Sequence, residues 1–208
     1  MNTKEEIIAS LTTPRQDKLN AMRWETFLSL GIPIEGKTIF EPGAGIGDQT
    51  QWLLDHGVAH IFVNDGRKDN LDVIRERFGS DGRPLFFVEG DLEHCLVYPE
   101  FKFKVDLVFC WGVYYHLRES FPAFPIMKGL ANIGETIVLD YLEGDDVEIS
   151  YGYDNPSTSL STYAFRPRTE TLMKAMKYIW GYSYLPKQQL EWVDPVAPET
   201  RLIAVASH

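Results

Sequence analysis

The chain has 208 residues, 44% hydrophobic and 24% charged, the size and balance of one soluble domain with a sizeable core. Its 20 basic and 30 acidic side chains leave a formal net charge of −10, so nonspecific attraction to a phosphate backbone is not expected, and nucleic acid is not the expected partner. No apolar run has the roughly 20 residues of a membrane helix, and the N-terminus lacks the apolar centre of a signal peptide. Cys95 and Cys110 cannot build a disulfide framework. We therefore expect a cytoplasmic protein without a membrane partner.

Strands and helices alternate along the chain in the manner of an α/β protein. Thr13 with Gln16 three residues later, and Pro14 between them, predicts the start of a helix that Gly31 ends. Short runs rich in β-branched and aromatic residues then predict strands at 38–41, 61–65, 85–88, 105–110, 136–140 and 201–206. These runs are too continuously apolar for an exposed face, so we expect helices on both sides of a largely parallel, doubly wound sheet.

The segments between the strands predict the helices and one long loop. A helix follows the first strand and ends at Gly57; the next has Asp69 as its N-cap, and a later one has Thr169 in that role. Pro122 and Pro125 predict a kinked or broken helix before the fifth strand. The polar stretch 143–167 is too long for a routine connection, which marks it as a candidate substrate lid.

The first strand ends in the most informative motif, Glu41-Pro42-Gly43-Ala44-Gly45-Ile46-Gly47. Glycines at alternate positions after a buried strand allow a ligand to approach the backbone itself. A dinucleotide fingerprint would have glycine where this chain has Asp48, and Glu41 adds a carboxylate where a pyrophosphate should lie. A ligand with a cationic centre and an ammonium group, such as S-adenosylmethionine, suits this motif better than NAD.

Two further turns follow the second and third strands. Asp65 ends the second strand, where an acidic side chain can accept hydrogen bonds from both hydroxyls of a ribose. Gly90-Asp91-Leu92 follows the third strand, where Asp91 can accept from an adenine amine and Leu92 can cover the ring. Either aspartate alone could equally be a capping or turn residue, but the carboxyl ends of parallel strands lie at one edge, where open α/β sheets bind ligands.

With these motifs the sequence resembles the class I S-adenosylmethionine-dependent methyltransferases, small-molecule type, from Thr38 to about Leu142 and more loosely in the tail. The resemblance rests on EPGAGIG, the Asp65 turn, GDL and VDLVFCWGVYYHL. It implies a Rossmann-like seven-stranded sheet in the order 3-2-1-4-5-7-6 with an antiparallel last strand. It also implies a single methyltransferase domain over residues 1–208, with an N-terminal helical segment at 1–31.

The resemblance further assigns a role in cofactor binding to individual residues. The methionine end of S-adenosyl-L-methionine is expected at Glu41 and at the backbone of the glycine turn, the ribose at Asp65, and the adenine at the third turn. The sulfonium group is expected beside the end of the fourth strand. The residues concerned are Glu41, Gly43, Ala44, Gly45, Gly47, Asp65, Gly90, Asp91, Leu92, Cys110 and Trp111.

The candidate catalytic residues follow the fourth strand. His116 can act as a general base because a neutral imidazole accepts a proton near pH 7; the competing interpretation is a structural histidine at the start of a helix. Tyr115 can orient the acceptor or fill the core. No metal is expected, because Cys95 and Cys110 lack C-x-x-C spacing and the histidines are scattered.

The sequence therefore predicts transfer of a methyl group to an oxygen or nitrogen of a small-molecule acceptor. Two alternatives remain: an NAD-dependent oxidoreductase, which Asp48 and the missing Tyr-x-x-x-Lys pair oppose, and a non-catalytic methyltransferase-like subunit. An RNA acceptor is disfavoured by the acidic charge balance and by the lack of an appended basic domain.

Overall fold

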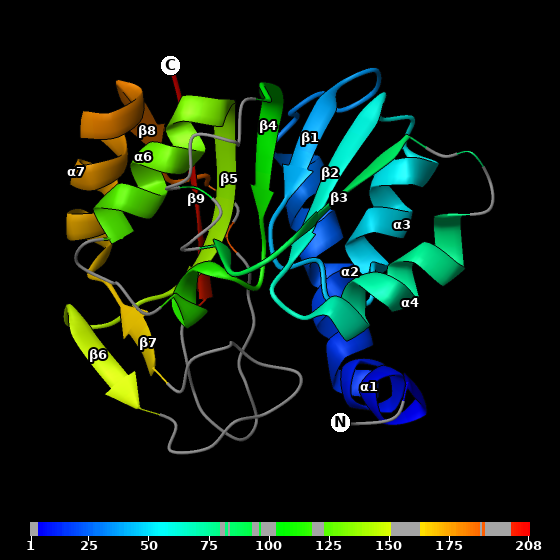
Figure 1. Cartoon of the computed structure of the whole chain (residues 1–208). Helices are drawn as coiled ribbons and strands as arrows, with labels where there is room; N and C mark the ends of the chain where they lie inside the picture. The colour runs from blue at the N-terminus through cyan, green and yellow to red at the C-terminus, as the bar shows by residue number, and fades with distance from the viewer. Residues whose placement is uncertain are drawn as a thin grey trace.

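A seven-stranded sheet runs through the computed structural model, which describes residues 4–79, 82, 84–92, 96, 103–117, 123–150, 163–187, 189 and 201–208 (Figure 1). The strand order is β3-β2-β1-β4-β5-β9-β8. The strands, in chain order, are β1 (Thr38–Glu41), β2 (His60–Asp65), β3 (Leu85–Glu89), β4 (Val105–Cys110), β5 (Gly134–Leu142), β8 (Tyr182–Tyr184) and β9 (Arg201–Ser207).

The order of the strands and their directions confirm the sheet that the resemblance implies. Strands β1 to β5 pair in parallel, and β9 inserts antiparallel between β5 and β8. The sequence did not predict β8, a three-residue strand that pairs only with β9 among the described residues. The carboxyl ends of β1, β2, β3, β4 and β5 therefore lie along one edge of the sheet.

The helices confirm one predicted cap and correct two others. Thr13 Oγ1 accepts a hydrogen bond from the Gln16 amide at 3.1 Å, as predicted for the N-cap of α2. Asp69 and Thr169 lie inside their helices instead, because the chain turns helical one or two residues earlier, after Arg67 and Arg168. The helices are α1 (Lys4–Leu11), α2 (Pro14–Ser29), α3 (Asp48–Asp55), α4 (Lys68–Phe78), α6 (Ala123–Ile133) and α7 (Thr169–Trp180).

Pro125 does not break a helix, contrary to the prediction. It lies in the first turn of α6, where the backbone N–H has no intrahelical partner to lose. Pro122, the other half of that prediction, lies outside the described residues.

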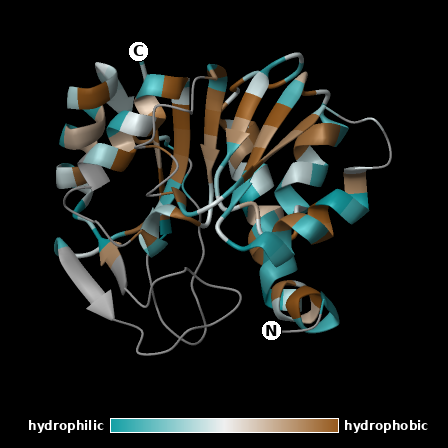
Figure 2. Ribbon diagram, viewed as in Figure 1, coloured by the Kyte–Doolittle hydropathy of each residue, from teal (hydrophilic) through white to brown (hydrophobic). Residues whose placement is uncertain are grey.

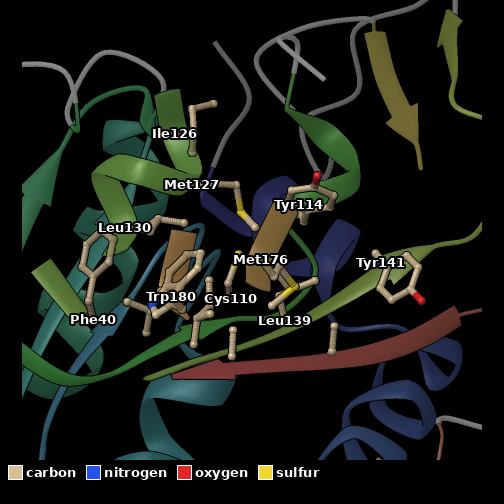
Figure 3. Packing of buried hydrophobic residues seen from close by; sticks show 14 of the residues in the cluster. Phe40, Cys110, Tyr114, Ile126, Met127, Leu130, Leu139, Tyr141, Met176 and Trp180 are labelled. Carbon is tan, nitrogen blue, oxygen red and sulfur yellow. The ribbon is translucent and has the colours of Figure 1, made fainter. Parts of the chain in front are cut away.

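Two hydrophobic clusters cover the two faces of the sheet, as the strand composition predicted. On one face β4 contributes Leu107 and Phe109 to a cluster with α2, α3 and α4; on the other it contributes Val108 and Cys110 to a cluster with α6 and α7 (Figure 3). Figure 2 shows the apolar residues concentrated along the central strands. Successive side chains of β4 point to opposite faces of the sheet, so this one strand contributes to both layers of the core.

The candidate lid contains a two-stranded antiparallel ribbon, β6 (Val147–Ser150) with β7 (Tyr163–Arg166), and its residues 151–162 lie outside the described part. Strand β7 packs against the short 3-10 helix η2 (Tyr114–His116), which follows β4. The ribbon therefore adjoins the predicted catalytic residues. No described helix combines the length and apolar character of a membrane span.

Candidate functional site

The glycine turn after β1 has a backbone that only glycine adopts freely. Gly43, Gly45 and Gly47 have φ values of 62°, 59° and 85°, which L side chains adopt at a cost. A Cβ on Gly43 would overlap the Val113 side chain, and one on Gly47 would lie 2.9 Å from the Phe78 ring. At Gly45 the nearest atom would be 4.0 Å away. The middle of the turn is therefore the part that leaves room beside its backbone.

Glu41 places a carboxyl group at the base of this turn. It is 1% exposed, and its Oε2 accepts a hydrogen bond from Thr50 Oγ1 at 2.7 Å. Its Oε1 has no hydrogen-bond partner among the described residues. Burial raises the pKa of Glu41 to about 8, despite the Thr50 hydrogen bond. At neutral pH the Glu41 carboxyl of the ligand-free protein is therefore largely uncharged. The sequence argument that a charged Glu41 would repel a pyrophosphate is correspondingly weaker.

Asp65 connects the end of β2 to the glycine turn. Its Oδ2 accepts a hydrogen bond from the Gly45 amide at 2.9 Å, while its Oδ1 accepts from the Arg67 amide and from Asn70 Nδ2. Burial raises the pKa of Asp65, and these hydrogen bonds oppose the rise. The side chain thus holds the middle of the turn in place and retains acceptor capacity on Oδ2.

Asn64, which sequence reasoning missed, joins the second turn to the third. Its Nδ2 donates to the carbonyls of Val88 and Gly90, at 2.9 and 3.0 Å, and the Gly90 amide donates to the Asp65 carbonyl. An amide at the buried end of a strand, next to an acidic residue, was the available signal. Leu92 is buried and Asp91 is partly exposed in the turn held this way. The structure thus brings the predicted residues Glu41, Asp65 and Gly90–Leu92 together at the edge formed by the carboxyl ends of the parallel strands.

Cys110 is the last residue of β4 and Trp111 follows it, and their side chains lie in the clusters on opposite faces of the sheet. Cys110 is fully buried among the residues around α6 and α7, where burial raises the pKa of its thiol (Figure 3). Trp111 stacks on Phe109 at 5.3 Å in the other cluster. Both side chains therefore contribute to the core, so any contact of Cys110 with a cofactor would use its backbone.

A buried ionic cluster, absent from the sequence predictions, lies just beyond β4. Asp140 Oδ2 accepts from Arg23 Nη2 at 3.0 Å and from Arg201 Nη1 at 3.2 Å, and its Oδ1 accepts from the Gly112 amide at 2.6 Å. Burial alone would raise the pKa of Asp140, but the two guanidinium groups hold it below its ordinary value. The cluster ties α2, β5 and β9 to the turn after β4.

Tyr115 and His116 adjoin this cluster. The Tyr115 hydroxyl accepts from Arg23 Nη2 at 3.4 Å, and the Arg201 guanidinium lies 4.5 Å from the centre of the Tyr115 ring. Burial, followed by the charge of Arg201, lowers the pKa of His116 to about 4. The imidazole is therefore neutral at pH 7, as a proton acceptor must be, but its surroundings make it a weak base.

Solved structures resemble this fold closely enough to compare. The chain aligns with the N-terminal domain of EvdMO1, crystallised in the presence of SAH and D-fucose, at 19% identity and a TM-score of 0.69, over 94% of this chain and 84% of that one. It aligns with magnesium protoporphyrin IX methyltransferase from Synechocystis PCC 6803, with bound SAM, at 15% identity and a TM-score of 0.63, over 100% and 85% of the two chains. Residues 40–129, which include all three turns, match the family model described as a methyltransferase domain.

Residues 40–129 therefore carry a methyltransferase domain, and the fold around them is that of class I S-adenosylmethionine-dependent methyltransferases. A curated relative, the tRNA U34 carboxymethyltransferase of Shewanella halifaxensis, is 24% identical over 160 residues, which are 74% of this chain and 47% of the relative. This methyltransferase thus spans about half the length of that relative.

The donor and acceptor groups of this methyltransferase suit S-adenosylmethionine. The unpartnered Glu41 Oε1 can receive a cationic or ammonium group, Asp65 Oδ2 can receive a hydroxyl, and the backbone at Gly45 is open to close approach. Among the described residues, no three His, Cys, Asp or Glu side chains are grouped to hold a metal ion.

Proposed function

We propose that this methyltransferase transfers a methyl group to an oxygen or nitrogen of a small-molecule acceptor. The observation that carries the proposal is the joining of the three strand-end turns into one edge by the Asp65 and Asn64 hydrogen bonds. That edge continues into the turn after β4, because the backbone of Gly43 approaches the Val113 side chain. The predicted cofactor residues and the predicted catalytic residues are therefore adjacent.

The cofactor roles follow from these contacts. Glu41 and the backbone of the glycine turn would hold the methionine end, Asp65 the ribose, and the turn at Asp91 and Leu92 the adenine. When bound, S-adenosylmethionine supplies a methyl group already activated on a positively charged sulfur. What remains for the protein is to align the acceptor, worth about 7–11 kcal/mol, and to accept its proton, worth roughly 10²–10⁴-fold in rate.

Buried groups surround the predicted transfer point, which supports a small acceptor. Tyr115 is 6% exposed, Phe165 of β7 is 5% exposed, and β7 packs on η2. We propose that residues 143–167 act as the lid over this point and that the whole chain forms one catalytic unit, to which the segment 1–31 contributes Arg23 of α2.

His116 is proposed as the proton acceptor and Tyr115 as the residue that orients the substrate. His116 is uncharged at pH 7 because its pKa is lowered to about 4, so the imidazole can take a proton. The Tyr115 hydroxyl already accepts a hydrogen bond from Arg23, so its own hydrogen can be donated to an acceptor molecule.

An RNA acceptor is the second candidate, because the tRNA U34 carboxymethyltransferase is among the relatives. The formal charge of −10 weighs against it, since a protein that binds a phosphate backbone gains most of its nonspecific affinity from basic side chains.

The test measures SAH formation by mass spectrometry after incubation with S-adenosylmethionine and either a small-metabolite extract or total RNA. We expect SAH to form with the extract and to be insensitive to ribonuclease. SAH formation that requires intact RNA would contradict the small-molecule proposal.

The variant His116→Ala tests the proposed proton acceptor. It should leave the dissociation constant of SAH within about twofold and lower turnover by roughly 10²-fold or more. Undiminished turnover would show that His116 is not the proton acceptor.

A further inference from the structure

The buried ionic cluster carries more positive than negative charge. It comprises Arg23, Asp140, Arg201 and Tyr115, whose residues are 3%, 0%, 9% and 6% exposed. Both guanidinium groups share the single carboxylate of Asp140. Within the described part of the chain this leaves one positive charge without a counter-charge in the cluster. Burying a charge without a partner is costly, so the surplus favours binding of an anion.

The hydrogen-bond inventory of the cluster points the same way. Arg23 Nε is buried and has no hydrogen-bond partner among the residues that the structure describes. The Tyr115 hydroxyl accepts from Arg23, and since a guanidinium only donates, the hydroxyl hydrogen is not used in that bond. Asp140 Oδ1 is already used by the Gly112 amide. The cluster therefore has donors in excess and lacks an acceptor.

The position of the cluster places this surplus at the predicted transfer point. The Arg23 guanidinium lies over the Gly112 backbone, where a Cβ would be 3.1 Å from Nη2, and the next residue, Val113, approaches Gly43 of the glycine turn. Arg201 begins β9, opposite Leu142 at the carboxyl end of β5. The positive charges of Arg201, Arg23 and Arg166 lower the pKa of His116, and the negative charge of Asp140 opposes them. A group bound here would lie between the cofactor edge and His116.

We propose that the Arg23–Asp140–Arg201–Tyr115 cluster binds a carboxylate of the methyl acceptor, so that the acceptor is a carboxylic acid. The surplus is a single charge, which one carboxylate neutralises, whereas a phosphate dianion would overcompensate it. A guanidinium fork also matches the two oxygens of a carboxylate. The bound carboxylate would lessen the positive charge around His116 and so make its imidazole a better base when the acceptor is in place.

This inference rests on the proposed function and specifies its substrate class. The test uses the full chain, with and without SAH, and measures binding of acetate, acetamide and inorganic phosphate by calorimetry and thermal shift at constant ionic strength. The matched variants are Arg201→Gln, Arg201→Lys and Arg75→Gln; Arg75 is a partly exposed arginine that pairs with Asp72 on α4.

We expect wild-type protein to bind acetate in preference to acetamide and phosphate. Arg201→Gln should weaken acetate binding by about tenfold or more, because a charge-assisted hydrogen bond is lost, while Arg201→Lys retains part of it and Arg75→Gln retains all of it. The dissociation constant of SAH should change by less than about twofold in all three variants.

Equal responses to acetate and acetamide would overturn the carboxylate proposal, and so would an undiminished acetate response in Arg201→Gln or a stronger response to phosphate. Each of these results leaves the proposed function intact if SAH still binds. A wild-type protein that binds acetate but not SAH would contradict the proposed function alone. Because the acetate measurement is made with and without SAH, the two failures are distinguishable.

Discussion

The two halves of the candidate site are built in different ways. The cofactor half, around Glu41 and Asp65, uses backbone amides, positive-φ glycines and side-chain hydrogen bonds between residues at most 26 positions apart. The acceptor half, around Asp140, is held by side chains 117 and 61 residues away from it in sequence. The first half is a local sequence motif, which different proteins that bind the same kind of ligand can share. The second half is assembled only by the tertiary fold, and acceptor specificity can be set there.

Asp140→Asn should give the largest loss of stability, because it leaves two buried guanidinium groups without a counter-charge. Removing one partner of a buried ion pair typically costs about 3–5 kcal/mol. Arg201→Gln should cost less, since Arg23 and Asp140 then balance one another. The free energy of unfolding in urea, measured for both variants, compares them directly. If Asp140→Asn costs no more than Arg201→Gln, the cluster has no positive surplus.

Gly43→Ala should damage the cofactor half next. Gly43 has φ 62°, and a Cβ would also overlap Val113. Gly31 is a matched control, with φ 65° and nothing within 4 Å of its would-be Cβ. Left-handed backbone costs an alanine about 1–2 kcal/mol, so Gly31→Ala should lose about that much stability and retain SAH binding. Gly43→Ala should lose more stability and weaken SAH binding by about tenfold or more. Equal losses in both variants would show that the close approach to Val113 has no consequence.

The same contrast explains what the sequence could and could not predict. Strands β1 and β4 have the predicted bounds, because buried parallel strands are continuous apolar runs bounded by turn residues. Strand β8 was missed because Tyr182–Tyr184 is too short for a periodic signal and depends on its pairing with β9. The turns at Gly43 and Asp65 were visible as local motifs. Arg23 and Arg201 were not, because nothing near them in sequence indicates that both contact Asp140.

Asp65→Ala tests the ribose assignment and should weaken SAH binding by roughly 10–100-fold. The variant loses both an acceptor for a hydroxyl and the hydrogen bond that holds the Gly45 amide. Asp65→Asn is the control, since it retains one oxygen for the amide, and it should bind more tightly than Asp65→Ala. Calorimetric titration with SAH distinguishes these variants. Unchanged affinity in Asp65→Ala would remove this residue from the cofactor half.

Glu41→Gln should have the smallest effect at a single pH and a clear effect on the pH dependence of stability. Because burial raises the pKa of Glu41 from 4.5 to about 8, the folded protein binds this proton more tightly than the unfolded chain, and the stability that it contributes is lost as pH rises through 8. His116 has the opposite sign: its pKa is lowered from 6.5 to about 4, so its contribution changes below pH 6.5.

Between pH 6.5 and 8 the difference in stability between the wild type and Glu41→Gln reports on Glu41, because the raised pKa of Asp65 and the lowered pKa of His116 act in both proteins. Wild-type protein should lose stability relative to Glu41→Gln across that range, at no more than about 1.4 kcal/mol per pH unit, in urea unfolding at several pH values. Binding of S-adenosylmethionine should also release a proton near pH 7 in the wild type only, because a cation beside Glu41 favours the carboxylate. That release is visible as a buffer-dependent binding enthalpy. A pH-independent stability difference together with no proton release would mean that Glu41 is already ionised, so that the cofactor half is negatively charged before any ligand arrives.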